Sequence, residues 1–126
     1  MSGIDLEYSN WMELATHDFN SAEMLINKTE YFDIVVYHIH QAAEKMLKAF
    51  IVKNKNTYKR IHDLDKLLKE CMEFDDSFSS IANEILFIHS YLGKVRYPFG
   101  EKITEDEARE CFNKAKIIIE AVKNGG

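Results

Sequence analysis

The sequence predicts an all-α protein, an up-and-down four-helix bundle with an additional short helix. Apolar residues recur at steps of three and four along most of the 126 residues, which is the period of an amphipathic helix. The sequence contains no alternation of apolar and polar residues that is long enough to favour a β-strand instead. Short polar links separate the periodic stretches, as in antiparallel bundles. A length of 126 residues fits a single domain over residues 1–126, and a hydrophobic content of 46% is enough for one core.

Two long helices are predicted in the first half of the chain. Asn10 can cap the first, with Glu13 completing a capping box, and this helix should end near residues 27–29. The second should run from about Tyr31 to Val52. Its apolar residues share one broad arc, and the opposite arc holds Tyr37, Gln41, Glu44, Lys45 and Lys48. We expect this helix to pack its apolar side and to offer the polar arc to solvent or a ligand.

The second half predicts a short helix, a longer one and a final one. The short helix spans about Asp63 to Met72, and the next opens at residues 75–76 and continues to about Leu92. Residues 93–100 contain the only proline and two glycines, so we expect no regular helix there. Thr104 and Glu107 form a capping box that starts the last helix.

Charge and cysteine content exclude several classes of protein. The net charge of −5 argues against wrapping of duplex DNA, because such binding depends on cations that neutralise phosphates. No apolar run is long enough for a membrane span, and the N-terminus lacks the features of a signal peptide. Cys71 and Cys111 show no paired or metal-binding spacing, so we expect two reduced, partly buried thiols. These features predict a soluble, cytoplasmic protein.

Cations gather in two links of this acidic chain, beside the end of the second helix. A local anion site could form there with Gln41, Lys45 and Lys48, since lysine and arginine suit phosphate. The same pattern is typical of a solvated helix face with exposed linkers, and the sequence leaves both interpretations open. The cations of the two links are Lys53, Lys55, Lys59, Arg60, Lys94 and Arg96.

The five histidines do not predict a metal site. His38 and His40 are two positions apart on a helix and point in different directions. His17, His62 and His89 have no partner at a metal-binding spacing. Glycine-rich phosphate loops and nucleophile elbows are missing from the sequence as well. We therefore predict no metal and no cofactor.

Several motifs together resemble the HEPN domain family over essentially the whole chain. They are the segment from Gln41 to Ala49, the segment from Ile61 to Leu64 with two following leucines, and Tyr91 with an Arg-Tyr-Pro motif at residues 96–98. The spacing of Trp11, Ala15, Asp18 and Ala22 also matches. The resemblance implies a helical bundle that commonly forms homodimers, often paired with a small nucleotidyltransferase in toxin–antitoxin systems. It also implies nucleotide or RNA binding.

One branch of that family cleaves RNA without metal, using an arginine followed by four to six residues and a histidine. None of Arg60, Arg96 and Arg109 has a histidine at that spacing, which argues against ribonuclease activity. A second departure is Phe99, where similar proteins usually carry an acidic residue.

Three functions follow as hypotheses. The first is a module that binds a nucleotide or single-stranded RNA and works with a nucleotidyltransferase, its site residues being Gln41, Lys45, Lys48, His62, Arg96 and Tyr97. In this hypothesis the cations hold phosphate and the tyrosine stacks on a base. The second is a divergent endoribonuclease with His62 as acid–base and Arg96 at the phosphate. The third is a dimeric interaction module with Tyr91, Tyr97 and Phe99 as buried anchors.

Overall fold

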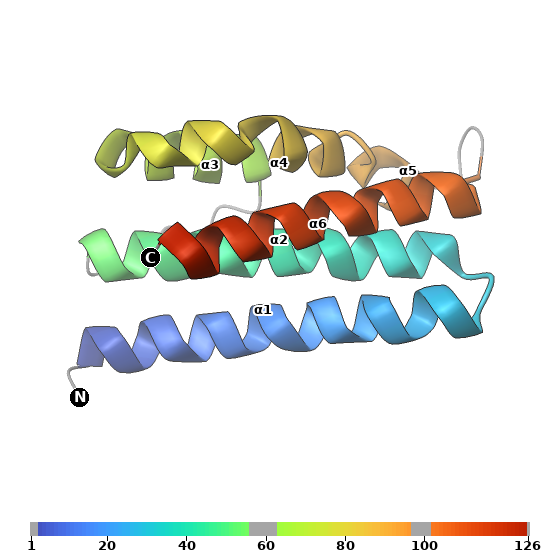
Figure 1. The fold of residues 1–126 in the computed structure, drawn as a ribbon, viewed down its shortest axis with the longest axis horizontal. Coiled ribbons are helices and arrows are strands. Elements are labelled where there is room, and N and C mark those ends of the chain that lie inside the picture. Colours follow the sequence, from blue (N-terminus) through green and yellow to red (C-terminus); the bar gives the residue numbers. More distant parts are fainter. Residues whose placement is uncertain (1–2, 56–62, 97–101, 126) are drawn as a thin grey trace.

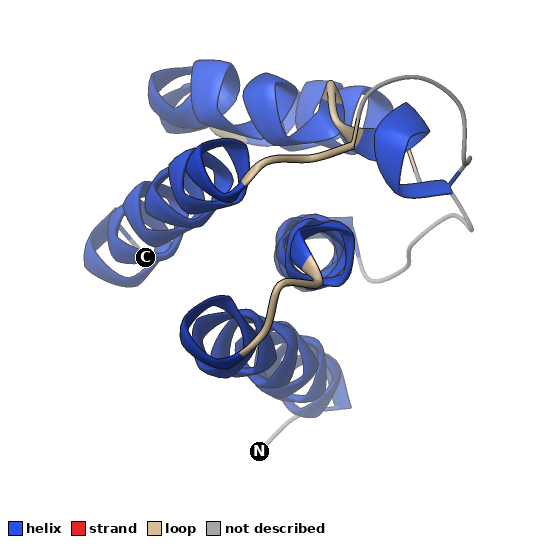
Figure 2. Ribbon diagram, turned by 90° about the vertical axis from the view of Figure 1, so that its right-hand side faces the viewer, coloured by secondary structure: helices blue, strands red, loops and turns tan. Residues whose placement is uncertain are grey.

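The helix α2 (Phe32–Lys55) runs through the centre of the bundle, with the other helices around it (Figures 1 and 2). The computed structural model describes residues 3–55, 63–96 and 102–125, without the side chains of residues 93, 96 and 123–125. Within these ranges α2 packs against α1, α3, α4, α5 and α6. The described residues are helices joined by short links, and the predicted all-α bundle is confirmed.

The first helix, α1 (Gly3–Lys28), lies alongside α2 and begins earlier than predicted. Asn10 lies inside this helix, so the prediction that it caps the N-terminus is wrong. A tertiary contact explains the extension. The Tyr8 ring packs edge-on against Phe50 of α2, with 5.4 Å between centroids, and the Lys53 ammonium lies 4.8 Å from the centroid of the same ring. These contacts stabilise a first segment that the local capping pattern does not favour.

Burial of α2 extends nearly all round the helix. From Ala42 to Val52 every residue except Lys45 is buried, including Glu44 and Lys48. The prediction was that the polar arc is offered to solvent or a ligand, and its solvent alternative is wrong at Glu44 and Lys48. The reason is the central position of α2, since a helix with neighbours on several sides has no wide solvent face.

The predicted fourth helix is divided into shorter elements. Helix α3 (Leu64–Phe74) follows its N-cap Asp63, and Asp75 then caps the 3-10 helix η1 (Asp76–Ile81). Helix α4 (Ala82–His89) follows, and Ile81 at the junction has φ −115° and ψ 9°, away from helical values. The chain thus changes helix type at Ile81, a break that the apolar spacing does not reveal.

The prediction that residues 93–100 form no regular helix is wrong for residues 93–96, which belong to helix α5 (Leu92–Arg96). A proline restricts mainly the backbone conformation of the residue before it. Pro98 therefore leaves residues 92–96 free to form one helical turn. The last helix, α6 (Glu105–Gly125), starts as predicted. Thr104 N–H donates to Glu107 Oε1 at 2.9 Å, and Glu107 N–H donates to Thr104 Oγ1 at 3.1 Å, which confirms the capping box.

The apolar core joins all the long helices around α2. Both cysteines are free, and both are fully buried within this core, whereas partial burial was predicted. None of the helices in the described part of the chain combines the length and the apolar content that crossing a membrane requires. The largest fully buried apolar side chains are Ile39, Leu47, Ile51, Leu64, Leu67, Ile85, Ile88 and Ile118.

Candidate functional site: a polar cluster along α2

Three polar side chains form a buried stripe on α2. His40, Glu44 and Lys48 follow one another at intervals of four residues, so they lie on one face of the helix. Their exposed fractions are 1%, 4% and 3%, as low as those of the apolar core. Burial of ionisable groups at three successive helical turns is unusual in a domain of this size. We call His40, Glu44 and Lys48, with the residues that contact them, the α2 polar cluster.

The part of this cluster nearer the C-terminus of α2 is an ion pair next to an aromatic ring. Lys48 Nζ donates to Glu44 Oε2 at 3.1 Å, and both side chains are at most 5% exposed. The same ammonium lies 5.5 Å from the centroid of the Trp11 ring on α1, within the range of a cation–π interaction. Charges removed from water lose several kcal/mol of solvation each, roughly, and close pairing offsets this loss. Trp11 and Glu44 together therefore stabilise a buried lysine.

The part of the cluster nearer the N-terminus of α2 is a chain of two imidazoles and a carboxylate. His40 Nε2 lies 3.4 Å from His89 Nδ1 on α4, and His89 Nε2 lies 3.3 Å from Asp63 Oδ1. Asp63 also accepts a hydrogen bond from the Asp65 N–H as the N-cap of α3. An acceptor at Nε2 favours the His89 tautomer that carries its proton there, which leaves Nδ1 to accept from His40. Three helices thus meet through a single polar chain.

A second group, between α1 and α2, surrounds the Asp18 carboxylate. Its Oδ1 lies 2.9 Å from His38 Nδ1, and its Oδ2 accepts a hydrogen bond from Lys45 Nζ. The Asp18 side chain is 13% exposed, against 25% for Lys45 and 29% for His38. Helix α2 therefore presents His38 and His40 to different neighbours, as their spacing predicted.

The residues predicted to bind phosphate differ in how the structure positions them. Gln41 and Lys45 are half-buried on α2, and Lys48 is buried in the polar cluster. Arg96 ends α5, which packs against α2, although its side chain is outside the described part. His62 and Tyr97 lie outside the described residues, as does Phe99.

Carboxylates approach two of the cations expected to form an anion site. Lys55 Nζ lies 3.2 Å from Glu70 Oε1 and 3.1 Å from Glu73 Oε2, and Lys94 Nζ lies 3.3 Å from Glu107 Oε2. Helices α3 and α6 thus bring acids from elsewhere in the sequence to these two lysines, and these acids offset part of the positive charge of the links. Lys59 and Arg60 belong to the undescribed segment 56–62.

Tyr91, predicted as an interface anchor, contacts residues of its own chain. Its ring lies 5.4 Å from that of Phe87, and Lys94 Nζ lies 5.5 Å from its centroid. Burial, with a hydrogen bond to Glu107, raises the pKa of the Tyr91 hydroxyl to about 12.

The contacts of His40, His89, Asp63 and Trp11 in the polar cluster are not among the predictions from the sequence. The four-residue spacing of His40, Glu44 and Lys48 was a usable signal, because polar residues at such positions interrupt an otherwise apolar helix. No local signal pairs His40 with His89, which lie 49 positions apart. Within residues 3–55, 63–96 and 102–125, no three or more His, Cys, Asp or Glu residues are grouped to hold a metal ion.

Comparisons with known proteins agree with the fold. The model of the HEPN domain matches residues 8–125. "Putative toxin MJ1304" of Methanocaldococcus jannaschii is 26% identical over an alignment of 140 positions. The alignment covers 98% of this chain and 91% of that protein. The crystal structure of ST0689, an archaeal HEPN homologue, superposes with a TM-score of 0.68 at 22% identity and covers 94% of this chain and 96% of its own. The chain therefore belongs to the HEPN domain family.

Proposed function

We propose that this chain is the HEPN subunit of a toxin–antitoxin type system and binds a nucleotide or single-stranded RNA at the α2 polar cluster. The family match and the similarity to "Putative toxin MJ1304" support the type of system. The observation that carries the site is the buried stripe of His40, Glu44 and Lys48. Such groups lower the stability of a core unless they are fully compensated, so their presence inside a small bundle is typical of a functional site.

Lys48 and Trp11 supply the two interactions that a nucleotide needs. The indole ring lies against the Lys48 ammonium at 5.5 Å. When the ring moves aside, the ammonium becomes accessible to a phosphate and the indole becomes free to stack on a base. Gln41 and Lys45 lie on the more accessible side of the same helix. There the Gln41 amide can hydrogen-bond a base or a phosphate, and a phosphate can compete with Asp18 for Lys45.

His62, Arg96 and Tyr97 complete the proposed site. His62 directly precedes Asp63, whose carboxylate contacts His89 in the cluster, and Arg96 ends the helix α5 that packs on α2. In this proposal Arg96 holds phosphate and Tyr97 stacks on a base.

The proposal includes a homodimer and a small nucleotidyltransferase as partner. Exposed apolar side chains in the last turns of α1, the link to α2 and the first turns of α2 support a protein interface: Met24 is 60% exposed, Tyr31 66%, Ile34 42% and Tyr37 42%. Light scattering of the purified chain measures the dimer. Co-purification with a co-expressed small nucleotidyltransferase from the same organism, in wild type and Tyr31→Asp, tests the partner.

Fluorescence tests the binding site directly, because Trp11 is the only tryptophan in the chain. ATP, GTP and short single-stranded RNAs are titrated while the emission of Trp11 is followed, with calorimetry as a second measurement. We expect a saturable change in emission for the wild type. Arg96→Ala should weaken binding by about tenfold or more, as for loss of a charge-assisted hydrogen bond.

The double variant Glu44→Leu/Lys48→Met removes the buried charges together and should also weaken binding, while circular dichroism confirms its fold. Lys116→Ala is the matched control, since Lys116 is an exposed lysine on α6 and its loss should leave binding unchanged. Absence of both an emission change and a heat signal at millimolar ligand would overturn the proposed site.

Metal-independent RNA cleavage is the second candidate function. The contacts from Asp63 to His89 and from His89 to His40 offer a route for a proton, and His62 directly precedes Asp63 in the sequence. Single-stranded RNA incubated with chelator should then be cut, and both His62→Ala and His89→Gln should reduce the rate. Cleavage that persists in His62→Ala would reject this mechanism.

A further inference from the structure

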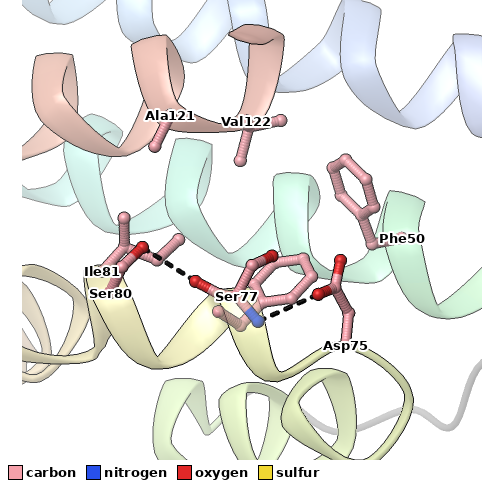
Figure 3. Close-up of a pocket in the computed structure, with 8 residues that line it drawn as sticks. Phe50, Asp75, Ser77, Ser80, Ile81, Ala121 and Val122 are labelled. Carbon is pink, nitrogen blue, oxygen red and sulfur yellow. Dashed lines mark hydrogen bonds between the residues drawn. The ribbon is translucent and has the colours of Figure 1, made fainter. Parts of the chain in front are cut away.

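A pocket at one end of the bundle contains none of the residues of the α2 polar cluster. It has a volume of about 180 Å³ and opens between η1, the C-terminal half of α2 and the last turns of α6 (Figure 3). Its lining residues are Phe50, Asp75, Ser77, Phe78, Ser80, Ile81, Ala121 and Val122.

The inner wall of the pocket is apolar and partly aromatic. Phe50 and Phe78 meet edge to face, with 5.3 Å between their centroids, and Ile81 and Val122 complete this wall. These four side chains are at most 8% exposed. A cavity of about 150 Å³ holds a benzene molecule, so this pocket has room for one aromatic ring or a short branched alkyl group.

The rim is polar and carries a carboxylate. Asp75 Oδ1 accepts a hydrogen bond from Ser77 N–H at 2.9 Å, and Ser80 Oγ donates to the Ser77 carbonyl at 2.8 Å. The hydrogen bonds from Ser77 lower the pKa of Asp75, so the group is ionised at neutral pH. In Figure 3 the second carboxylate oxygen of Asp75 points away from Ser77 and toward Phe50.

The C-terminal ends of α3 and α6 and the N-terminus of η1 lie near this rim. Helix α3 ends at Phe74, directly before Asp75, and the residues from α6 belong to its last two turns. The C-terminal end of a helix carries partial negative charge from its free carbonyl groups, which favours a nearby cation. The N-terminus of η1, which Asp75 caps, carries the opposite partial charge, so the preference of the rim for a cation rests on the Asp75 carboxylate.

We propose that this pocket binds a small organic cation, a protonated amine that carries one aromatic ring or a short branched alkyl group. The apolar body fills the space between Phe50, Phe78 and Val122, and the ammonium donates to Asp75 and to the hydroxyl groups of the rim. This site goes beyond the proposed nucleotide function and does not depend on it.

Benzylamine is the probe, with benzyl alcohol and benzoate as the neutral and anionic ligands of matched shape. Titrations followed by amide NMR at neutral pH should give saturable shifts for benzylamine at the amides of the lining residues. We expect benzyl alcohol to bind about fivefold more weakly and benzoate more weakly still, as for loss or reversal of one exposed ion pair.

Variants separate the charge from the cavity. Asp75→Asn keeps an N-cap for η1 but removes the charge, and should reduce the affinity for benzylamine to that for benzyl alcohol. Asp76→Asn removes a neighbouring carboxylate that does not line the pocket, and should leave binding unchanged. Ala121→Phe fills the space and should abolish the shifts for all three ligands. The proposal is overturned if benzylamine gives no saturable shifts, if benzyl alcohol binds as tightly, or if Asp75→Asn binds like the wild type.

Discussion

Lys48 Nζ and Glu44 Oε2 lie 3.1 Å apart inside the bundle, one helical turn from each other on α2. Because both side chains are buried, removal of one partner leaves a charge in the interior. Lys48→Met should therefore destabilise the protein by about 3–5 kcal/mol in urea unfolding.

The double variant Glu44→Leu/Lys48→Met should recover most of this loss, because an apolar pair of similar volume needs no compensation. Lys116→Met, on the exposed face of α6, should change the stability by less than about 0.5 kcal/mol. If the double variant is less stable than Lys48→Met alone, the account of the buried pair is wrong.

Asp63 has two roles, as the N-cap of α3 and as the acceptor for His89 Nε2. Asp63→Ala should lower the stability by about 1 kcal/mol through loss of the cap, and Asp63→Asn, which can still cap, should lower it less. Nitrogen NMR of the imidazoles should find the His89 proton at Nε2 in the wild type and a mixture of tautomers in Asp63→Ala. The same tautomer in both proteins would contradict the orienting role.

The capping box of α6 predicts a pH dependence. The backbone hydrogen bond from Thr104 holds the pKa of Glu107 below its ordinary value of 4.5. A carboxyl group with a lowered pKa stabilises the fold above its unfolded pKa, and this contribution is lost as the pH falls. Glu107→Ala should therefore be clearly destabilising at neutral pH, by about 1 kcal/mol, and less so near about pH 3.

Denaturant unfolding of the wild type and Glu107→Ala at both pH values measures this difference, with Glu120→Ala on the exposed side of the same helix as control. An equal effect of Glu107→Ala at both pH values would show that the ionised carboxylate does not stabilise the helix start.

Burial raises the pKa of both thiols, Cys71 and Cys111, to about 12. At about pH 8 the native protein should therefore react with a disulfide reagent far more slowly than the unfolded chain, because the thiolate is the reactive form. A thiol whose pKa is raised by folding also makes the folded state less stable as the pH rises from 9.0 toward about 12. Rapid labelling of two thiols in native protein would contradict their burial.

Helix order and the start of α6 could be predicted from the sequence, because both depend on local chemistry. Capping at Thr104 and the apolar period of α2 involve residues a few positions apart. The start of α1 could not be predicted, since Tyr8 is held by Phe50 and Lys53 of another helix. The change from 3-10 helix to α-helix at Ile81 could not be predicted either, because the apolar spacing continues across it.

The candidate site divides in the same way. By itself the sequence determined that Gln41, Lys45 and Lys48 share α2, because three- and four-residue spacing defines a helix face. Only the tertiary structure decided that Lys48 is buried against Glu44 and Trp11, and that His40 meets His89. Burial depends on which helices surround α2, and that arrangement results from long-range packing that no local spacing records.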